Sequence, residues 1–126
     1  MLFNVEKCVV MNIGANNKLY PYNMNNATLK TVDLERDLGV VINKNGRYSE
    51  QCLMAAKKAN CVLGMIKSNI KCKNAAIIMG IYKSLVRPRL EYCIQAWSTY
   101  HKKDIEVLER VQKRAKNGLW IWGLKL

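Results

Sequence analysis

Hydrophobic residues in the first 48 positions form short runs separated by turn-forming residues. The runs cover residues 8–13, 19–24, 28–32 and 37–42. Asn25-Asn26 lies between the second and third runs, and asparagine tolerates the positive φ angles that tight hairpin turns require. Residues 43–46 (Asn-Lys-Asn-Gly) are a strong turn signal after the last run. The pattern predicts a small antiparallel sheet of three to four strands.

From residue 49 onward the spacing of hydrophobic residues changes to that of an amphipathic helix. Its apolar residues recur at steps of three and four: Cys52, Ala55, Ala56, Ala59, Leu63, Ile66 and Ile70. Ser49 is the expected N-cap, and Glu50 is well placed at the positive end of the helix dipole. We expect another backbone to approach closely at the three alanines.

A second helical pattern contains a slip of one residue. Asn74 is its expected N-cap. Its first apolar residues are Ile78, Ile81, Tyr82 and Leu85. The spacing then predicts an apolar residue at position 89, where Arg89 stands, and the stripe resumes at Leu90 and continues to Trp97. Because proline removes a backbone hydrogen bond and clashes with the preceding turn, we expect a kink or break at Pro88.

The last helix is predicted from about Asp104 to about residue 117. Its expected buried stripe is Ile105, Leu108, Val111 and Ala115. Glutamates 106 and 109 each precede a basic residue by four positions, which stabilises a helix by about 0.2–0.5 kcal/mol per pair. The apolar residues 119–126 (LWIWGLKL) would either cover the core or remain exposed.

Together these patterns predict an α+β fold with two parts. Residues 1–48 would form the sheet, and residues 49–126 a three-helix, mostly antiparallel bundle. The net charge is +12, and it is concentrated in the second part. Residues 1–48 carry six basic and four acidic side chains, whereas residues 49–126 carry fifteen and five. Such a surface favours polyanionic partners because bound phosphates release their counterions, although a solvated basic surface is an equal alternative.

The five cysteines include no C-x-x-C pair, and His101 is the single histidine of the chain. This composition favours free thiols in a reducing compartment over a zinc site or disulfides. The sequence shows no signal-peptide pattern and no apolar window of the roughly 18 residues that a membrane span requires. We therefore expect an intracellular protein, nuclear or cytoplasmic, that is neither secreted nor bound to a membrane.

Five sequence blocks carry a resemblance to a known family. They are FNVEKC with VVMNIG, ERDLGVVIN, SEQCLMAAKKANCVLGMIK, YKSLVRPRLEYCIQAWS and KKDIEVLERVQKRA. In this order and spacing they resemble the reverse transcriptases of non-LTR (LINE-type, jockey-like) retrotransposons. The resemblance extends from about Phe3 to Lys116, and it implies the end of a palm subdomain followed by a thumb.

The resemblance implies roles for two groups of residues in the first part. Lys7, together with Asn4, matches a motif whose lysine is thought to act near the departing pyrophosphate. A surface lysine beside a strand is the alternative. Leu38, Gly39 and Val40 match the primer-grip hairpin, where glycine lets the backbone approach a nucleic-acid strand. The alternative is an ordinary core strand with a glycine kink, and Asp37 replaces the aromatic residue that many members have there.

The catalytic aspartates of the family have no counterpart in this sequence. Reverse transcription uses Mg²⁺ ions held by palm aspartates, which the family carries in a strand upstream of the matched blocks. The three aspartates of this chain, Asp33, Asp37 and Asp104, are not adjacent to one another. We expect the chain alone to be inactive as a polymerase and to hold no cofactor. One histidine and the lack of a glycine-rich phosphate loop give little support to an independent enzyme.

The resemblance and the charge favour sequence-independent binding to RNA or an RNA–DNA duplex. The expected phosphate-binding residues are Lys57, Lys58, Arg87, Arg89, Lys113 and Arg114. Arg87 and Arg89 could instead pair with Glu91. Trp97 and Tyr100 are candidates for base stacking, but Trp97 continues an apolar stripe and is expected in the core.

A second hypothesis is a small helical interaction module, or a decayed retrotransposon product without activity. In that case the apolar helix faces would contact the missing palm and fingers region or another protein.

Overall fold

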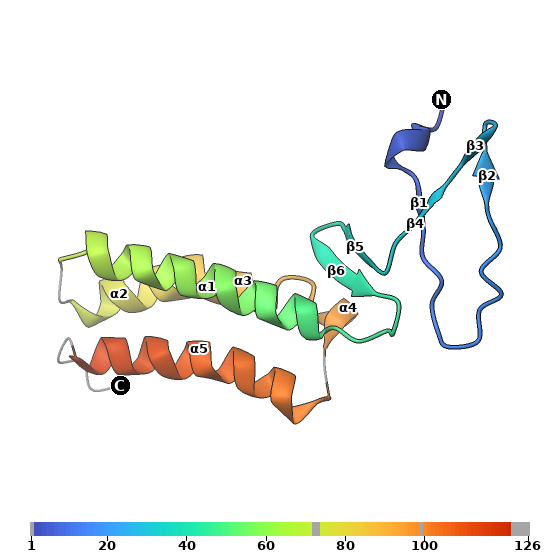
Figure 1. Cartoon of the computed structure of the whole chain (residues 1–126). Helices are drawn as coiled ribbons and strands as arrows, with labels where there is room; N and C mark the ends of the chain where they lie inside the picture. Colours follow the sequence, from blue (N-terminus) through green and yellow to red (C-terminus); the bar gives the residue numbers. More distant parts are fainter. Residues whose placement is uncertain (1, 72–73, 99, 122–126) are drawn as a thin grey trace. The chain divides into compact units, whose positions relative to one another are not determined.

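The computed structural model describes residues 2–71, 74–98 and 100–121, and for Ala75 and residues 119–121 it describes the backbone alone. The chain divides into two compact units, Met1–Tyr48 and Ser49–Leu126 (Figure 1). Short strand pairs make up the first unit and helices the second, so the expected α+β fold class is confirmed. The side chains of the apolar segment 119–126, and Cys72, lie outside the described residues.

The strands of the first unit form three separate pairs in the described residues. A short 3₁₀ helix, η1 (Val5–Lys7), precedes them. The pairs are β1 (Val9–Val10) with β4 (Lys30–Thr31), β2 (Asn23–Met24) with β3 (Ala27–Thr28), and β5 (Leu34–Asp37) with β6 (Val40–Asn43). The first pair is parallel and the other two are antiparallel, in place of the single antiparallel sheet expected. The predicted run 19–24 is shortened to β2 because Pro21 has no N–H to donate to a ladder.

A two-residue turn at Asn25-Asn26 joins β2 to β3, as the sequence indicates. Met24 lies opposite Ala27, and the φ angles of the two asparagines are 49° and 62°. Two positive φ angles in a two-residue loop define a type I′ turn, whose twist matches that of the flanking strands.

A second turn of the same kind falls inside the predicted strand 37–42, so that prediction is wrong. Leu38 and Gly39 have φ angles of 47° and 82°, and Asp37 lies opposite Val40. The left-handed conformation suits glycine but is strained for leucine. The apolar run therefore reaches the buried interior only at Val40 and Val41 of β6.

The second unit is a bundle in which the chain reverses direction twice (Figure 1). Its elements are α1 (Ser49–Asn69), α2 (Ala75–Ile81), η2 (Tyr82–Val86), α3 (Arg87–Glu91), α4 (Ile94–Trp97) and α5 (Lys102–Ile121). Helix α1 packs against both α5 and α3. The predicted α1 stripe is confirmed, with Cys52, Ala55, Ala56, Ala59 and Ile66 buried and Leu63 and Ile70 partly buried. Asn74 caps α2 as expected, because its Oδ1 accepts from the N–H groups of Ala76 and Ile77.

The irregularity expected at Pro88 is a π turn that lies just before it. In η2 the hydrogen bonds span five residues, and the Arg87 N–H donates to the Tyr82 carbonyl. This wider turn absorbs the extra residue, so that Val86 is fully buried while Leu85 is 51 % exposed. The prediction that Leu85 belongs to the buried stripe is therefore wrong. The helix continues through Pro88 to Glu91, so of the two expected alternatives, a kink or a break, the chain is not broken at this proline.

The chain leaves the helix only at Tyr92 and Cys93. Cys93 has a left-handed φ of 53°, and α4 follows it directly. Trp97, at the end of α4, is 1 % exposed, and its indole N–H donates to the Tyr92 carbonyl. The expectation that Trp97 belongs to the core is confirmed, and its hydrogen bond ties α4 to the preceding bend.

A polar contact joins the starts of α1 and α5. Ser49 is the first residue of α1. Its hydroxyl donates to Oδ2 of the buried Asp104 at 2.9 Å and so contacts another helix. Burial, and secondarily the charge of Asp104, raise the pKa of the Cys52 thiol to about 11. Along α5, Val111 and Ala115 are buried as predicted, but Ile105 is exposed and Asp104 is buried in the turn beside it.

Candidate nucleic-acid interface

Two polar stripes face each other along α1 and α5. The α1 stripe consists of the polar residues Asn60 and Lys67 with Gly64 between them, and the α5 stripe of Arg110, Arg114 and Asn117. Each stripe has steps of four and three residues, which keep its members on one side of a helix. The Arg114 Nη1 atom donates to Asn60 Oδ1 at 3.4 Å, which places the two stripes in contact.

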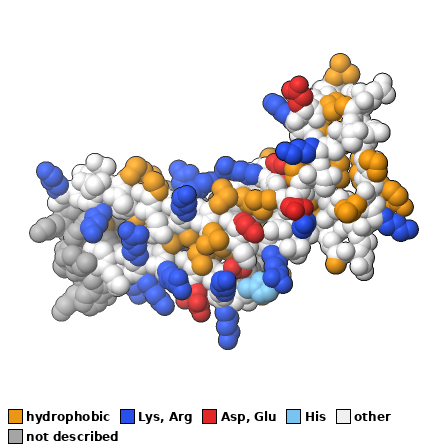
Figure 2. All heavy atoms as spheres, in the orientation of Figure 1, with side chains coloured by type: hydrophobic (Ala, Val, Ile, Leu, Met, Phe, Trp, Pro, Cys, Tyr) orange, Lys and Arg blue, Asp and Glu red, His pale blue; other side chains and the backbone are white. Residues whose placement is uncertain are grey.

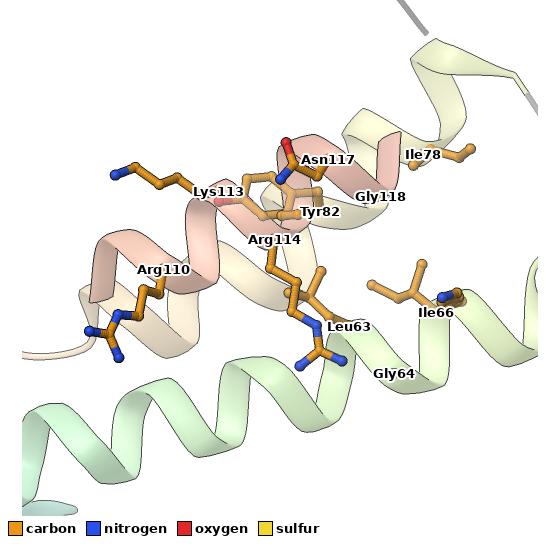
Figure 3. Close-up of a pocket in the computed structure, with 12 residues that line it drawn as sticks. Leu63, Gly64, Ile66, Ile78, Tyr82, Arg110, Lys113, Arg114, Asn117 and Gly118 are labelled. Carbon is orange, nitrogen blue, oxygen red and sulfur yellow. The ribbon is translucent and has the colours of Figure 1, made fainter. Parts of the chain in front are cut away.

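A cavity of about 420 Å³ opens between these stripes (Figure 3). Its apolar floor is formed by Leu63, Ile66, Ile78, Tyr82 and Ala115. Its basic rim consists of Lys67, Arg110, Lys113 and Arg114, and we call this rim and floor the basic groove. Among the described residues that line the groove, none is acidic. All charged side chains of the described lining are therefore basic.

The four rim cations differ in their orientation. Figure 3 shows Arg110 and Arg114 extending from α5 toward α1, whereas Lys113 points away from α1. Lys113 Nζ also lies 3.9 Å from Glu109 Oε2, which offsets part of its charge. The two arginines are therefore better placed than Lys113 to bind an anion in the groove.

A second cavity, of about 540 Å³, lies between η2, α3 and α5. Its charged lining residues are Lys83, Arg87, Lys113, Lys116, Glu91 and Glu109. Arg87 Nε donates to Glu91 Oε1 at 2.7 Å, and this hydrogen bond raises the pKa of the arginine. The alternative of an Arg87–Glu91 pair is thus realised. Because its lining carries both basic and acidic side chains, this second cavity is a weaker site for a polyanion.

Three other predicted phosphate-binding residues lie outside both cavities. Lys57 and Lys58 are exposed on α1, and neighbouring residues of a helix point about 100° apart, so the two face different directions. Arg89 is exposed in α3. Figure 2 shows that basic side chains are spread over the helical unit, interrupted by a few acidic ones. Of the six predicted residues, the structure brings Lys113 and Arg114 together in the groove.

The sequence-predicted residues of the first unit occupy local features of that unit. Lys7 is exposed at the end of η1, whose start is capped by the Asn4 side chain accepting from the Glu6 N–H. Leu38 and Gly39 form the turn between β5 and β6, and Val40 is the buried first residue of β6. The β5–β6 hairpin therefore turns at Gly39, one of the residues that match the primer grip.

Sequence reasoning missed Lys67 and Arg110 as members of a site. Lys67 was recognisable as lying off the apolar stripe of α1, and Arg110 was assigned to a pair with Glu106. The matching spacing of residues 60, 64 and 67 and of residues 110, 114 and 117 was the available signal. It becomes informative only when α1 and α5 are known to be neighbours.

The aspartates do not form a metal site. Asp33 pairs with Lys44 at 2.9 Å, Asp37 lies in β5, and Asp104 accepts from Ser49. Within the described ranges, no group of three or more His, Cys, Asp or Glu residues is placed to hold a metal ion.

No helix among the described residues is long and apolar enough to cross a membrane. Comparisons with protein-family models, with curated proteins and with solved structures found no match to this chain.

Proposed function

We propose that this chain binds the backbone of RNA or of an RNA–DNA duplex without sequence preference, as the palm-end and thumb portion of a non-LTR retrotransposon reverse transcriptase. The basic groove is the observation that carries the proposal. It combines Lys67, Arg110 and Arg114 between two helices, with no acidic residue in its described lining. The five sequence blocks support the assignment to this family. The groove would bind nucleic acid and would take no part in polymerase chemistry.

The chemistry of the groove suits phosphates better than bases. An arginine guanidinium presents a planar set of donors that can hold two phosphate oxygens at once. Arg110 and Arg114 lie one helical turn apart and extend to the same side, so they can hold neighbouring phosphates (Figure 3). Asn60 and Asn117 add neutral polar groups at the edges of the groove. None of these contacts selects a sequence, because phosphates are the same at every base.

Fluorescence anisotropy with a labelled RNA–DNA duplex tests the proposal. Binding should weaken as salt increases, because each neutralised phosphate releases counterions. Arg110→Gln and Arg114→Gln should each reduce the slope of log K against log salt by about 0.9. Arg89→Gln is the matched control, because this exposed arginine lies outside the groove. No duplex binding at low salt, or an equal effect of all three substitutions, would contradict the proposal.

The alternative of a helical interaction module is favoured by one observation. Ile77 of α2 and Leu85 of η2 are each about half exposed, and a protein partner could cover this apolar surface. Size-exclusion chromatography with light scattering separates the hypotheses. Self-association that Ile77→Ser and Leu85→Ser abolish, together with a lack of duplex binding, would favour the interaction module.

A further inference from the structure

The floor of the basic groove has no role in binding phosphates. Leu63, Ile66 and Ile78 face the cavity with Tyr82, while the positive charge is confined to the rim. The volume of about 420 Å³ falls within the range of about 300–1,000 Å³ that is typical of small-molecule sites. A phosphate would gain nothing from this floor, so the site as a whole suits an anion that carries an apolar, flat body.

Two glycines keep this cavity open. Gly64 of α1 and Gly118 of α5 both line it. A Cβ atom added at either position would meet no atom within 4 Å, so neither glycine is required by close packing. Gly64 lies inside a helix, where glycine is less favourable than alanine. Larger side chains at these positions would instead project into the open space.

We propose that the basic groove binds one unpaired base of a nucleic-acid strand, which enters the apolar floor while its neighbouring phosphates contact Arg110 and Arg114. This inference rests on the proposed function and specifies the form of nucleic acid that binds most tightly. A base has two apolar faces and polar edges, which matches the apolar floor beside the Asn117 amide. Its own phosphates supply the negative charge that the rim lacks.

The base would pack on the Tyr82 ring and the aliphatic side chains around it. Burial raises the pKa of Tyr82, so its phenol stays neutral and adds no charge that would repel the strand. In a duplex the bases are stacked and paired, and placing one in the groove requires unpairing it. The chain should therefore bind a single strand, or a frayed end, more tightly than a fully paired duplex of the same length.

Gly64→Phe provides a direct test, because it fills the cavity and removes no charge. Gly80→Phe is the matched control, since Gly80 is an exposed helical glycine of α2 with equally open surroundings that lines neither cavity. The probes are a single-stranded RNA containing 2-aminopurine and an RNA–DNA duplex of the same length. Gly64→Phe should weaken single-strand binding about tenfold, equivalent to about 1.4 kcal/mol, and leave duplex binding within about twofold. The 2-aminopurine fluorescence should change on binding to the wild-type chain and to Gly80→Phe, but not to Gly64→Phe.

The outcomes separate this inference from the proposed function. If the wild-type chain binds neither probe, both are overturned. If it binds the duplex in a salt-dependent way but shows no preference for the single strand, only the base-binding inference is overturned. If Gly64→Phe lowers thermal stability and leaves single-strand affinity unchanged, the base-binding inference is also overturned, and the chain's own residues 119–126 become the better candidate for the occupant.

Discussion

The extra residue of η2 leads to a specific prediction about deleting Ser84. A π turn contains one residue more than a regular helix needs over the same stretch. Ser84 is exposed in this turn, and its hydroxyl donates to the Ile81 carbonyl at 3.2 Å. Deleting it removes no buried side chain. The deletion therefore tests whether the extra residue of η2 keeps the apolar side chains directed into the core, or only avoids the steric clash of the Pro88 ring.

The register of the flanking side chains sets the expected outcome. Ile78 and Val86 are 2 % and 0 % exposed, so both must face the core. A regular helix turns about 100° per residue, so an eight-residue step would leave Val86 about 80° from Ile78, and a seven-residue step only about 20°. Deleting Ser84 thus keeps Val86 and Leu90 in the core, where burial of each contributes about 1.5–3 kcal/mol.

Pro88 is the reason why deleting Ser84 should destabilise the fold. In a regular helix the proline ring would clash with the carbonyl four residues earlier, which costs about 3 kcal/mol. We expect the Ser84 deletion to lower the free energy of unfolding by about this amount, and Pro88→Ala combined with the deletion to restore it to within about 1 kcal/mol of the wild type. Pro88→Ala alone should leave η2 in place, because the register still requires the extra residue.

Urea unfolding followed by far-UV circular dichroism measures these differences. Deletion of Lys58, an exposed residue inside the regular helix α1, is the control. It should abolish cooperative folding, because it turns one part of the α1 stripe by about 100° relative to the other. The reasoning is refuted if the combined variant is as unstable as the Lys58 deletion, or if Pro88→Ala fails to rescue the Ser84 deletion.

Three further predictions concern local features. Leu38→Asn should stabilise the β5–β6 hairpin by about 1 kcal/mol, because it replaces a strained leucine with the Asn-Gly pair that type I′ turns prefer; slower amide exchange in β6 would confirm this, and faster exchange would contradict it. Asn74→Ala should lower the free energy of unfolding by about 1 kcal/mol through loss of the α2 cap, whereas Asn74→Ser should retain most of it; equal losses in thermal denaturation would exclude a capping role. The pKa of Cys52 is raised from 9.0 to about 11 in the folded chain, so the unfolded state loses this proton first and stability should fall as pH rises from 9 toward 11. Cys52→Ala should reduce that fall and leave the contributions of the two tyrosines whose pKa is also raised, Tyr82 and Tyr92. An unchanged pH profile would show that Cys52 does not contribute.

Features that depend on a few neighbouring residues could be predicted from the sequence. The Asn25-Asn26 turn and the Asn74 cap depend on side chains within three positions of one another. The buried stripe of α1 follows from periodicity alone. The slip before Leu90 was also visible as a change in spacing. The sequence did not indicate that the slip lies in η2, because a helix can absorb one extra residue at any point where the backbone can widen.

Pairings between distant residues could not be predicted in the same way. The turn at Leu38 and Gly39 lies in an apolar run that is typical of a continuous strand, and only the pairing of β5 with β6 shows that the chain reverses there. Likewise, the parallel pair β1–β4 joins residues about twenty positions apart in a way that no local signal indicates. Serine is a residue type that is common at the N-cap, yet the Ser49 hydroxyl contacts Asp104 of another helix.

The sequence by itself determined the α+β class, the approximate positions of the helices and the concentration of positive charge in residues 49–126. Hydrophobic periodicity and charge are properties of the chain that folding does not change. Only the tertiary structure decided which of the many basic residues act together. Lys67 and Arg114 are 47 positions apart in the sequence, and they line one groove because α1 and α5 pack side by side. The electrostatic field at a surface depends on the positions of charges in space, which the order of residues along the chain does not specify.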